Sequence, residues 1–170
     1  MTSEFYLDDL NEINDLVNMN KNTKSLEDYL NSIQKLNEEN KFQEAISLYK
    51  EALNFYQNES DLHFNLGILL KNFGHKEESL QYFENTINLN PLFKEAYFEK
   101  AIILIDLNRD FQALKIYDNL LENHQNCKEA FNLKGIILAK NEENSLAIKS
   151  FDSAIEIDKN YFEAYLNKAI

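Results

Sequence analysis

The chain has 170 residues, which is long enough for one domain with a sizeable core. Its three glycines and one proline argue against a barrel or sandwich of many short strands, and they favour long helices with tight connections. The formal charge of −12 argues against nucleic acid or an anionic membrane surface as a partner, because both need a basic face. The single cysteine rules out an intrachain disulfide.

Residues 1–25 precede the periodic part of the chain and begin with acidic residues, without the apolar core of a signal peptide. Apolar residues recur there at about every third or fourth position, with acids between them. This spacing predicts an amphipathic helix over about 4–19, followed by a polar joint. We interpret the segment as a cap over the first repeat. The alternatives are a disordered tail and a segment that docks onto a partner or onto the chain's own groove.

From residue 26 onward, residues of one kind recur every 34 positions. The pattern gives four units at 26–59, 60–93, 94–127 and 128–161, and the start of a fifth at 162–170. Several columns stay in register without an insertion or deletion, as in repeat proteins. One column of small residues holds Gly67, Ala101, Gly135 and Ala169, and one aromatic column holds Tyr49, Phe83, Tyr117 and Phe151.

Within each unit the apolar residues have helical spacing rather than strand alternation. In the unit 60–93, one apolar run ends at Phe73 and Gly74, and a second run ends before Pro91. Gly74 can adopt the left-handed conformation that ends a helix, and Pro91 cannot continue one. Each unit is therefore predicted to be a pair of antiparallel helices, which buries its apolar faces only by stacking on its neighbours.

These columns resemble the tetratricopeptide repeat family. The second unit follows the family pattern at His63, Leu66, Gly67, Leu70, Ser79, Phe83, Thr86 and Pro91. The fourth follows it at Phe131, Gly135, Leu138, Ala147, Phe151 and Ala154, with Lys134 in the leucine position and Lys159 in the proline position. The resemblance implies an all-α fold, a right-handed superhelical solenoid of antiparallel helix pairs. Ile33 departs from the small-residue column, so we expect a wider helix–helix approach in the first unit.

The chain stops at Ile170, within the first helix of the fifth unit. Phe162, Ala164, Tyr165 and Ala169 have no second helix to cover them, whereas the ends of solenoids usually carry a polar cap. We expect either a fragment of a longer protein or a last helix that a partner or a second copy covers.

The sequence offers little for catalysis or metal binding. His63 stands in an aromatic column, which predicts a packed ring. His124 and Cys127 are spaced as a ligand pair, but a zinc site needs at least one further ligand, and none lies nearby in the sequence. Glu95 and Glu99 share a helix face where both are expected to stay charged. We therefore predict no catalytic site, no bound metal and no cofactor.

The resemblance also implies that the first helix of each unit lines a concave groove. The positions that face it in the family hold eight acids and two bases here, with apolar residues in the middle. An exposed apolar strip with a polar rim marks an interaction site, and this one predicts a basic amphipathic peptide or helix as the ligand. The predicted groove residues are Phe64, Asn65, Ile68, Phe98, Glu99, Ile102, Ile105, Asp106, Asn132, Leu133 and Ile136.

Part of this acidity has a simpler explanation. An acid at the second position of every unit lies at a helix N-terminus, where the helix dipole favours it by about 0.3–1 kcal/mol. That accounts for Glu27, Asp61, Glu95, Glu129 and Glu163, but it accounts for neither Glu99 nor Asp106.

Some family members hold the C-terminal carboxylate of heat-shock chaperones with cations and asparagines on three successive units. The matching positions here are Leu30, Gln34, Asn65, Glu95 and Glu99. Only Asn65 agrees, and two of the required cations are replaced by acids, so a chaperone tail is not expected as a ligand.

The sequence thus predicts a non-catalytic protein-binding module, a scaffold or adaptor in the cytoplasm whose partner is a protein or peptide. One alternative is a regulatory or substrate-presenting arm of a larger enzyme, with the catalytic domain beyond Ile170. The other is a self-association module, in which the last helix pairs with a second chain to form a homo-oligomer.

Overall fold

The computed structural model describes residues 24–169, and within this range every regular element is a helix. The helix predicted over 4–19 lies outside the described residues. The chain divides into two compact units, one that ends at Tyr56 and one that begins at Gln57.

The first unit contains one helix pair, α2 (Leu26–Glu38) and α3 (Phe42–Phe55). A capping box starts α2: the amide of Asp28 donates to the Ser25 hydroxyl, and the amide of Ser25 donates to the Asp28 carboxylate, both over 3.1 Å. These bonds satisfy backbone groups that the first turn of a helix leaves without partners. Ile33 on α2 and Tyr49 on α3 are both buried.

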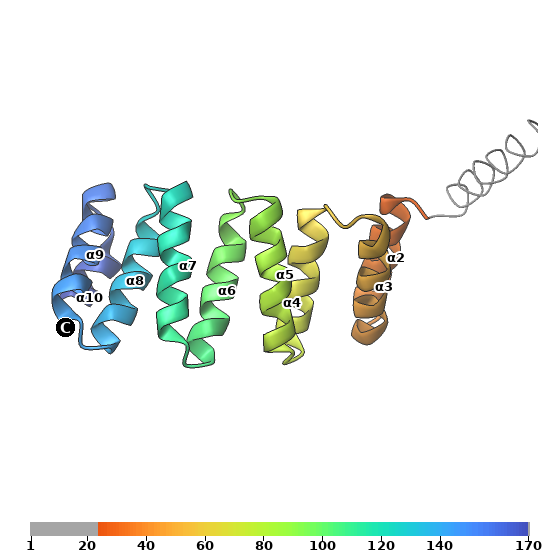
Figure 1. The fold of residues 1–170 in the computed structure, drawn as a ribbon, viewed down its shortest axis with the longest axis horizontal. Coiled ribbons are helices and arrows are strands. Elements are labelled where there is room, and N and C mark those ends of the chain that lie inside the picture. The colour runs from red at the N-terminus through yellow and green to blue at the C-terminus, as the bar shows by residue number, and fades with distance from the viewer. Residues whose placement is uncertain (1–23, 170) are drawn as a thin grey trace, which may run out of the picture. The chain divides into compact units, whose positions relative to one another are not determined.

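The second unit repeats this helix pair along the chain. Its helices are α4 (Ser60–Asn72), α5 (Lys76–Leu89), α6 (Lys94–Asp106), α7 (Asp110–Asn123), α8 (Lys128–Lys140), α9 (Asn144–Ile157) and α10 (Phe162–Lys168). The strongest packing joins α4 to α5, α6 to α7 and α8 to α9, and Figure 1 shows α4 to α10 following one another in chain order. The expected all-α solenoid of antiparallel helix pairs is confirmed for the described residues.

Each pair turns on a residue with left-handed backbone conformation. Gly74 has a φ of 82°, and the residues 34 positions before and after it, Asn40 and Asn108, both have a φ of 57°. Glu142, in the same column, has a φ of 63°. The cap conformation expected for Gly74 is therefore confirmed. The turn geometry recurs even where the residue has a side chain, which makes it unfavourable for Glu142.

The small and aromatic columns meet inside the second unit. A Cβ placed on Gly67 would lie 2.9 Å from the Phe83 ring, and one on Gly135 would lie 2.5 Å from the Phe151 ring. Both rings are buried. The column has glycine at these two positions because the facing ring already occupies the space that a methyl group would need.

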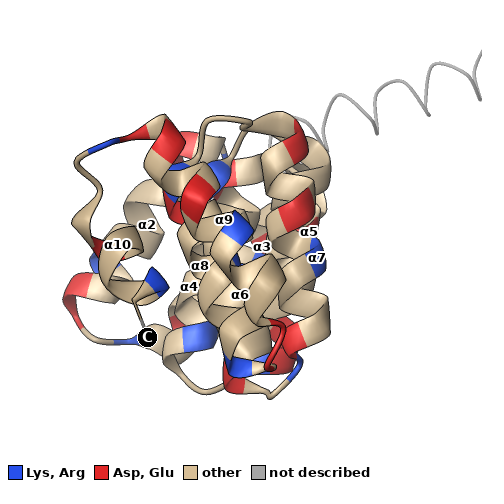
Figure 2. Ribbon diagram, turned by 90° about the vertical axis from the view of Figure 1, so that its left-hand side faces the viewer, with Lys and Arg blue, Asp and Glu red and all other residues tan. Residues whose placement is uncertain are grey.

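First helices of successive pairs contact one another in the second unit, α4 with α6 and α8 with α10. Viewed along the stack (Figure 2), α4, α8 and α10 lie to one side, α5 and α7 lie to the other, and α6 and α9 lie between them. We distinguish the surface formed by the first helices from the surface formed by the second helices. Among the described residues, no helix is both long enough and apolar enough to cross a membrane.

Candidate functional site

The predicted groove residues all lie on α4, α6 and α8, which are the first helices of their pairs. We call the surface that these helices present the first-helix face. Because the helices begin at residues 60, 94 and 128, equivalent positions recur along the face at the repeat interval. Side chains from one column therefore form a row across the three helices.

The most exposed apolar row of this face is made of isoleucines. Ile102 on α6 is 44% exposed and Ile136 on α8 is 40% exposed, whereas Ile68 on α4 is half-buried. Large apolar side chains are usually buried in a soluble domain, so two such residues in one column mark a surface that can contact a ligand.

The aromatic groove residues are less available than the isoleucines. Phe64 is half-buried, and its ring centroid lies 4.6 Å from that of Phe93 and 5.7 Å from that of Phe83. Phe98 is also half-buried, with its ring 6.0 Å from the Tyr117 ring. Both phenylalanines therefore contribute to the internal packing and present only part of their surface to a ligand.

The remaining members of the predicted set differ in exposure. Ile105 and Leu133 are half-buried against the core, whereas Asn65 is exposed. Asn132 is 5% exposed, and its amide oxygen accepts a hydrogen bond from Asn167 over 3.0 Å. That side chain serves the packing of α8 against α10 rather than an open groove.

The two acids that the helix dipole did not explain both have lysine partners. Lys71 lies 2.5 Å from Glu99, and Lys76 lies 2.8 Å from Asp106. Each pair links one helix pair to the next, which accounts for an acid at both positions. The count of acids in the sequence therefore overstates the negative charge that this face offers to a ligand.

The acids in the first turns of α4, α6, α8 and α10 have no lysine or arginine partner among the described residues, although Glu129 accepts a hydrogen bond from the Cys127 thiol. Asp61, Glu95, Glu129 and Glu163 lie in the first turns of α4, α6, α8 and α10. None of the four forms an ion pair with another described residue. They form one row of carboxylates at the N-terminal ends of these helices, where the helix dipole also stabilises them.

Comparison with family models identifies the repeats. Residues 60–91 and residues 112–162 both match models described as tetratricopeptide repeat. The chain belongs to the tetratricopeptide repeat family. Members of this family are generally non-catalytic interaction modules, and this protein is a scaffold-type module for protein interactions. No curated protein sequence matches the chain significantly.

Solved structures share the fold of this tetratricopeptide repeat protein. A tetratricopeptide repeat protein from Parabacteroides merdae is 19% identical with a TM-score of 0.75, over 84% of this chain and 57% of that one. YrrB, described as a TPR protein with an unusual peptide-binding site, is 20% identical with a TM-score of 0.67, over 90% of this chain and 79% of that one. MamA from Desulfovibrio magneticus is 20% identical with a TM-score of 0.66, over 82% of this chain and 79% of that one.

Two of the residues considered for catalysis or metal binding, His63 and Cys127, are buried among the repeats. His63 is buried, and its Nε2 lies 2.9 Å from the carbonyl oxygen of Gln57, as a packed ring in the aromatic column would. Burial raises the pKa of the Cys127 thiol, which disfavours the reactive thiolate. Within residues 24–169, no group of three His, Cys, Asp or Glu side chains could hold a metal ion.

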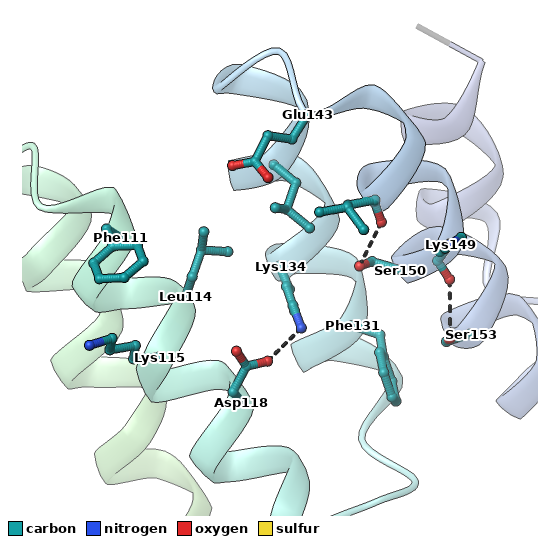
Figure 3. A pocket seen from close by; sticks show the side chains of 12 residues that line it. Phe111, Leu114, Lys115, Asp118, Phe131, Lys134, Glu143, Lys149, Ser150 and Ser153 are labelled. Atoms are coloured by element: carbon teal, nitrogen blue, oxygen red, sulfur yellow. Dashed lines mark hydrogen bonds and ion pairs between the residues drawn. The ribbon is translucent and has the colours of Figure 1, made fainter.

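The sequence reasoning missed a cleft on the other face of this tetratricopeptide repeat protein. The cleft has a volume of about 430 Å³ and lies between α7 and α9, with α8 at its base. Figure 3 shows Phe111, Leu114 and Lys115 on the α7 side and Lys149, Ser150 and Ser153 on the α9 side. The cleft residues Phe111, Leu146 and Ser150 have no like counterpart in the other units, so a search for repeated columns passes over them.

Proposed function

We propose that this protein is a non-catalytic scaffold or adaptor whose first-helix face binds a peptide or helix with basic and apolar side chains. The observation that carries this proposal is the exposure of Ile102 and Ile136, neighbours in one column, on a face that also presents a row of carboxylates without ion pairs among the described residues. The apolar side chains of the ligand would lie along the isoleucine row, and its cations would lie near the carboxylates of Glu95 and Glu129.

The apolar row is expected to supply most of the affinity. An exposed ion pair contributes about 0–1 kcal/mol, and Glu99 and Asp106 already have lysine partners for which a basic ligand would have to compete. Burial of an apolar side chain contributes about 1.5–3 kcal/mol. The carboxylates would mainly favour basic ligands over acidic ones and speed their association.

The likeness to YrrB supports peptide binding as a role for this fold, because the description of that structure names a peptide-binding site. The likeness does not indicate which peptide this chain binds. A chaperone tail is still not expected, because Glu95 and Glu99 replace the cations that hold the tail carboxylate in the family members that bind it. The cytoplasmic location and the alternative of an arm of a larger enzyme also stay predictions.

A binding assay with a matched control tests the groove. The probe is a fluorescently labelled synthetic amphipathic helix made of lysine and leucine, and fluorescence anisotropy measures its dissociation constant. Ile102→Glu and Ile136→Glu should each weaken binding about tenfold or more, because each places a charge in the apolar row. Ile148→Glu on α9 is the control, since Ile148 is 44% exposed, as Ile102 is.

The control separates a specific surface from general charge attraction. All three substitutions change the net charge equally, so equal binding by the three variants would refute the isoleucine row as the site. Phe98→Glu is a less informative variant, because Phe98 packs on Tyr117 and its replacement would also disturb the core. Circular dichroism of each variant confirms that helicity is retained.

Self-association through α10 is a second candidate function. Phe162, Tyr165 and Leu166 are 72%, 46% and 68% exposed, and their spacing places them on one side of the helix. Sedimentation velocity over a range of concentrations tests this idea. A mass that rises with concentration and falls back to that of the monomer in Leu166→Glu would support it, and a constant monomer mass would exclude it.

A further inference from the structure

The cleft between α7 and α9 combines apolar surface with unpaired positive charge in an acidic protein. Phe111 is 69% exposed and Leu146 is 47% exposed, and both line the cleft. Leu114 and Phe131 line it as half-buried side chains. Ligand sites are typically concave and mostly apolar, with a few polar groups that orient the ligand, and this cleft has that composition.

The lysines of this cleft stand out because most lysines in the second unit have acidic partners. Among the described residues of 57–169, four lysines form no ion pair: Lys94, Lys115, Lys149 and Lys159. Two of these, Lys115 and Lys149, line the cleft. In a chain with many more acids than bases, two unpaired cations at one apolar hollow indicate a site that attracts negative charge.

The other charges at the cleft do not cancel these cations. Lys134 donates a hydrogen bond to Asp118 over 2.5 Å, so these two residues neutralise each other. Glu143 is the one remaining acid among the residues that line the cleft. The hydroxyls of Ser150 and Ser153 donate to the backbone carbonyls of their own helix over 3.0 Å. Recognition of an anion would therefore depend on Lys115 and Lys149.

Lys115 lies next to the exposed Phe111 ring, where it could pair with a carboxylate of a bound peptide. Its Nζ lies 4.7 Å from the centroid of the exposed Phe111 ring, an arrangement in which the ring quadrupole attracts the cation. The ammonium group thus stays at the apolar edge of the cleft. An apolar side chain that packs against Phe111 would bring a neighbouring carboxylate of the same peptide close to it.

The exposed apolar residues of the cleft depart from the repeat, whereas Lys149 repeats Lys115 one unit later. At the preceding junction, Glu77 and Gln112 stand where this cleft has Phe111 and Leu146, and Gln81 stands where it has Lys115. Packing between units therefore does not require these side chains, because the solenoid forms without them one repeat earlier. Exposed residues that a repeat does not need for packing are candidates for binding.

We propose that the α7–α9 cleft binds a short acidic segment of a partner protein, which inserts one large apolar side chain against Phe111 and Leu146. Carboxylates of the segment pair with Lys115 and Lys149. This site lies on the opposite face from the isoleucine row and selects the opposite charge, so the scaffold can hold two unlike ligands at once. Binding weakens as salt is added, because exposed charge pairs are screened.

The test uses the full chain and a labelled synthetic peptide of aspartate and glutamate with one central phenylalanine. Fluorescence anisotropy at low salt should show binding, and replacing that phenylalanine by serine should weaken it. The double variant Lys115→Glu and Lys149→Glu should lose about tenfold or more in affinity. Lys159→Glu is the charge control, because Lys159 also lacks an ion pair but does not line the cleft. Ile102→Glu is the control for the other face, and both controls should bind within about twofold of the native chain.

Three results would overturn the proposal. They are no binding at millimolar peptide, equal binding by the phenylalanine and serine peptides, and an equal loss in Lys159→Glu and the double variant. Sedimentation velocity of Phe111→Ser provides a further check. If the native chain is a dimer and this variant is a monomer, the cleft is an interface between two copies rather than a site for an acidic segment.

Discussion

Lys134 on α8 donates a hydrogen bond to Asp118 on α7, and the same bond recurs at the junctions on either side. In each case the lysine follows the acid by 16 residues, and it joins the first helix of one pair to the second helix of the preceding pair. The other two pairs are Lys100 with Glu84 and Lys168 with Asp152. The repeat is therefore maintained by charges as well as by apolar columns.

The pair at α6 allows a test of how much this repeated ion pair contributes. The side chain of Lys100 is 14% exposed, and burial lowers its pKa. Leu66 holds the same column one unit earlier and is fully buried. Lys100→Leu should therefore leave the free energy of unfolding unchanged or raise it by about 1 kcal/mol, because an apolar side chain replaces a desolvated cation.

Glu84→Gln is the matched variant and should have the opposite effect. It leaves the ammonium group of Lys100 desolvated without its counter-ion, at a cost of about 1–2 kcal/mol. Urea denaturation measures both variants. A larger loss in Lys100→Leu than in Glu84→Gln would contradict this account. It would mean that the charged lysine stabilises this junction more than an apolar side chain does in its place.

Gly135→Ala should destabilise the protein although alanine is the better helix former. Alanine is favoured over glycine within a helix by about 1 kcal/mol, but the added methyl group would lie 2.5 Å from the buried Phe151 ring. Overpacking costs about 1–3 kcal/mol, so we expect a net loss of about 1–2 kcal/mol. Gly67→Ala should lose less, since its methyl group would lie 2.9 Å from Phe83. Thermal unfolding of the two variants gives the order, and a more stable Gly135→Ala would contradict this account.

The columns that build the interior could be predicted from the sequence because each one keeps a single kind of residue. Gly67 and Gly135 recur as small residues, and Phe83 and Phe151 recur as rings. The structure places each glycine against the ring of its own unit. Close packing restricts these positions so strongly that few residue types fit them, and the column stays recognisable.

The columns at the turns and at the unit junctions could not be predicted in the same way. Asn40, Asn108 and Glu142 share the backbone conformation of Gly74, but only the glycine signals it in the sequence. Lys134 looked like a departure from the leucine of the family pattern, because its partner Asp118 lies on another helix. The charge of the first-helix face was overestimated for the same reason, since a list of acids does not show which of them lysines neutralise.

Glu142→Gly should stabilise the turn between α8 and α9. A φ of 63° is unfavourable for a residue with a Cβ, by about 1–2 kcal/mol. Glycine removes this strain but increases the entropy of the unfolded chain, so the net gain should be about 0.5–1 kcal/mol. Asn108→Gly is the control and should gain less, because asparagine tolerates this conformation. Chemical denaturation reports both values, and an equal or larger gain in Asn108→Gly would argue against strain at Glu142.

Tyr117→Phe should stabilise the second unit. The Tyr117 hydroxyl is buried and has no hydrogen-bond partner among the described residues, which costs about 1–3 kcal/mol. Phenylalanine fills the same column at Phe83 and Phe151, so the ring fits without the hydroxyl. Tyr97→Phe is the control, because the Tyr97 hydroxyl donates to the carbonyl of Pro91 over 3.1 Å. That variant should lose about 1 kcal/mol in urea denaturation while Tyr117→Phe gains a similar amount.

The same tyrosine predicts how stability changes at alkaline pH. Burial raises the pKa of Tyr117, and it also raises that of Tyr97. A group whose pKa is higher in the folded state binds its proton more tightly there, so its contribution to stability is complete below the unfolded pKa of about 10 and is lost as the pH rises beyond it. The free energy of unfolding should therefore fall as the pH rises above about 10, by up to about 1.4 kcal/mol per pH unit for each such tyrosine. Tyr117→Phe should reduce this slope, whereas a substitution that affects packing alone would shift stability equally at every pH.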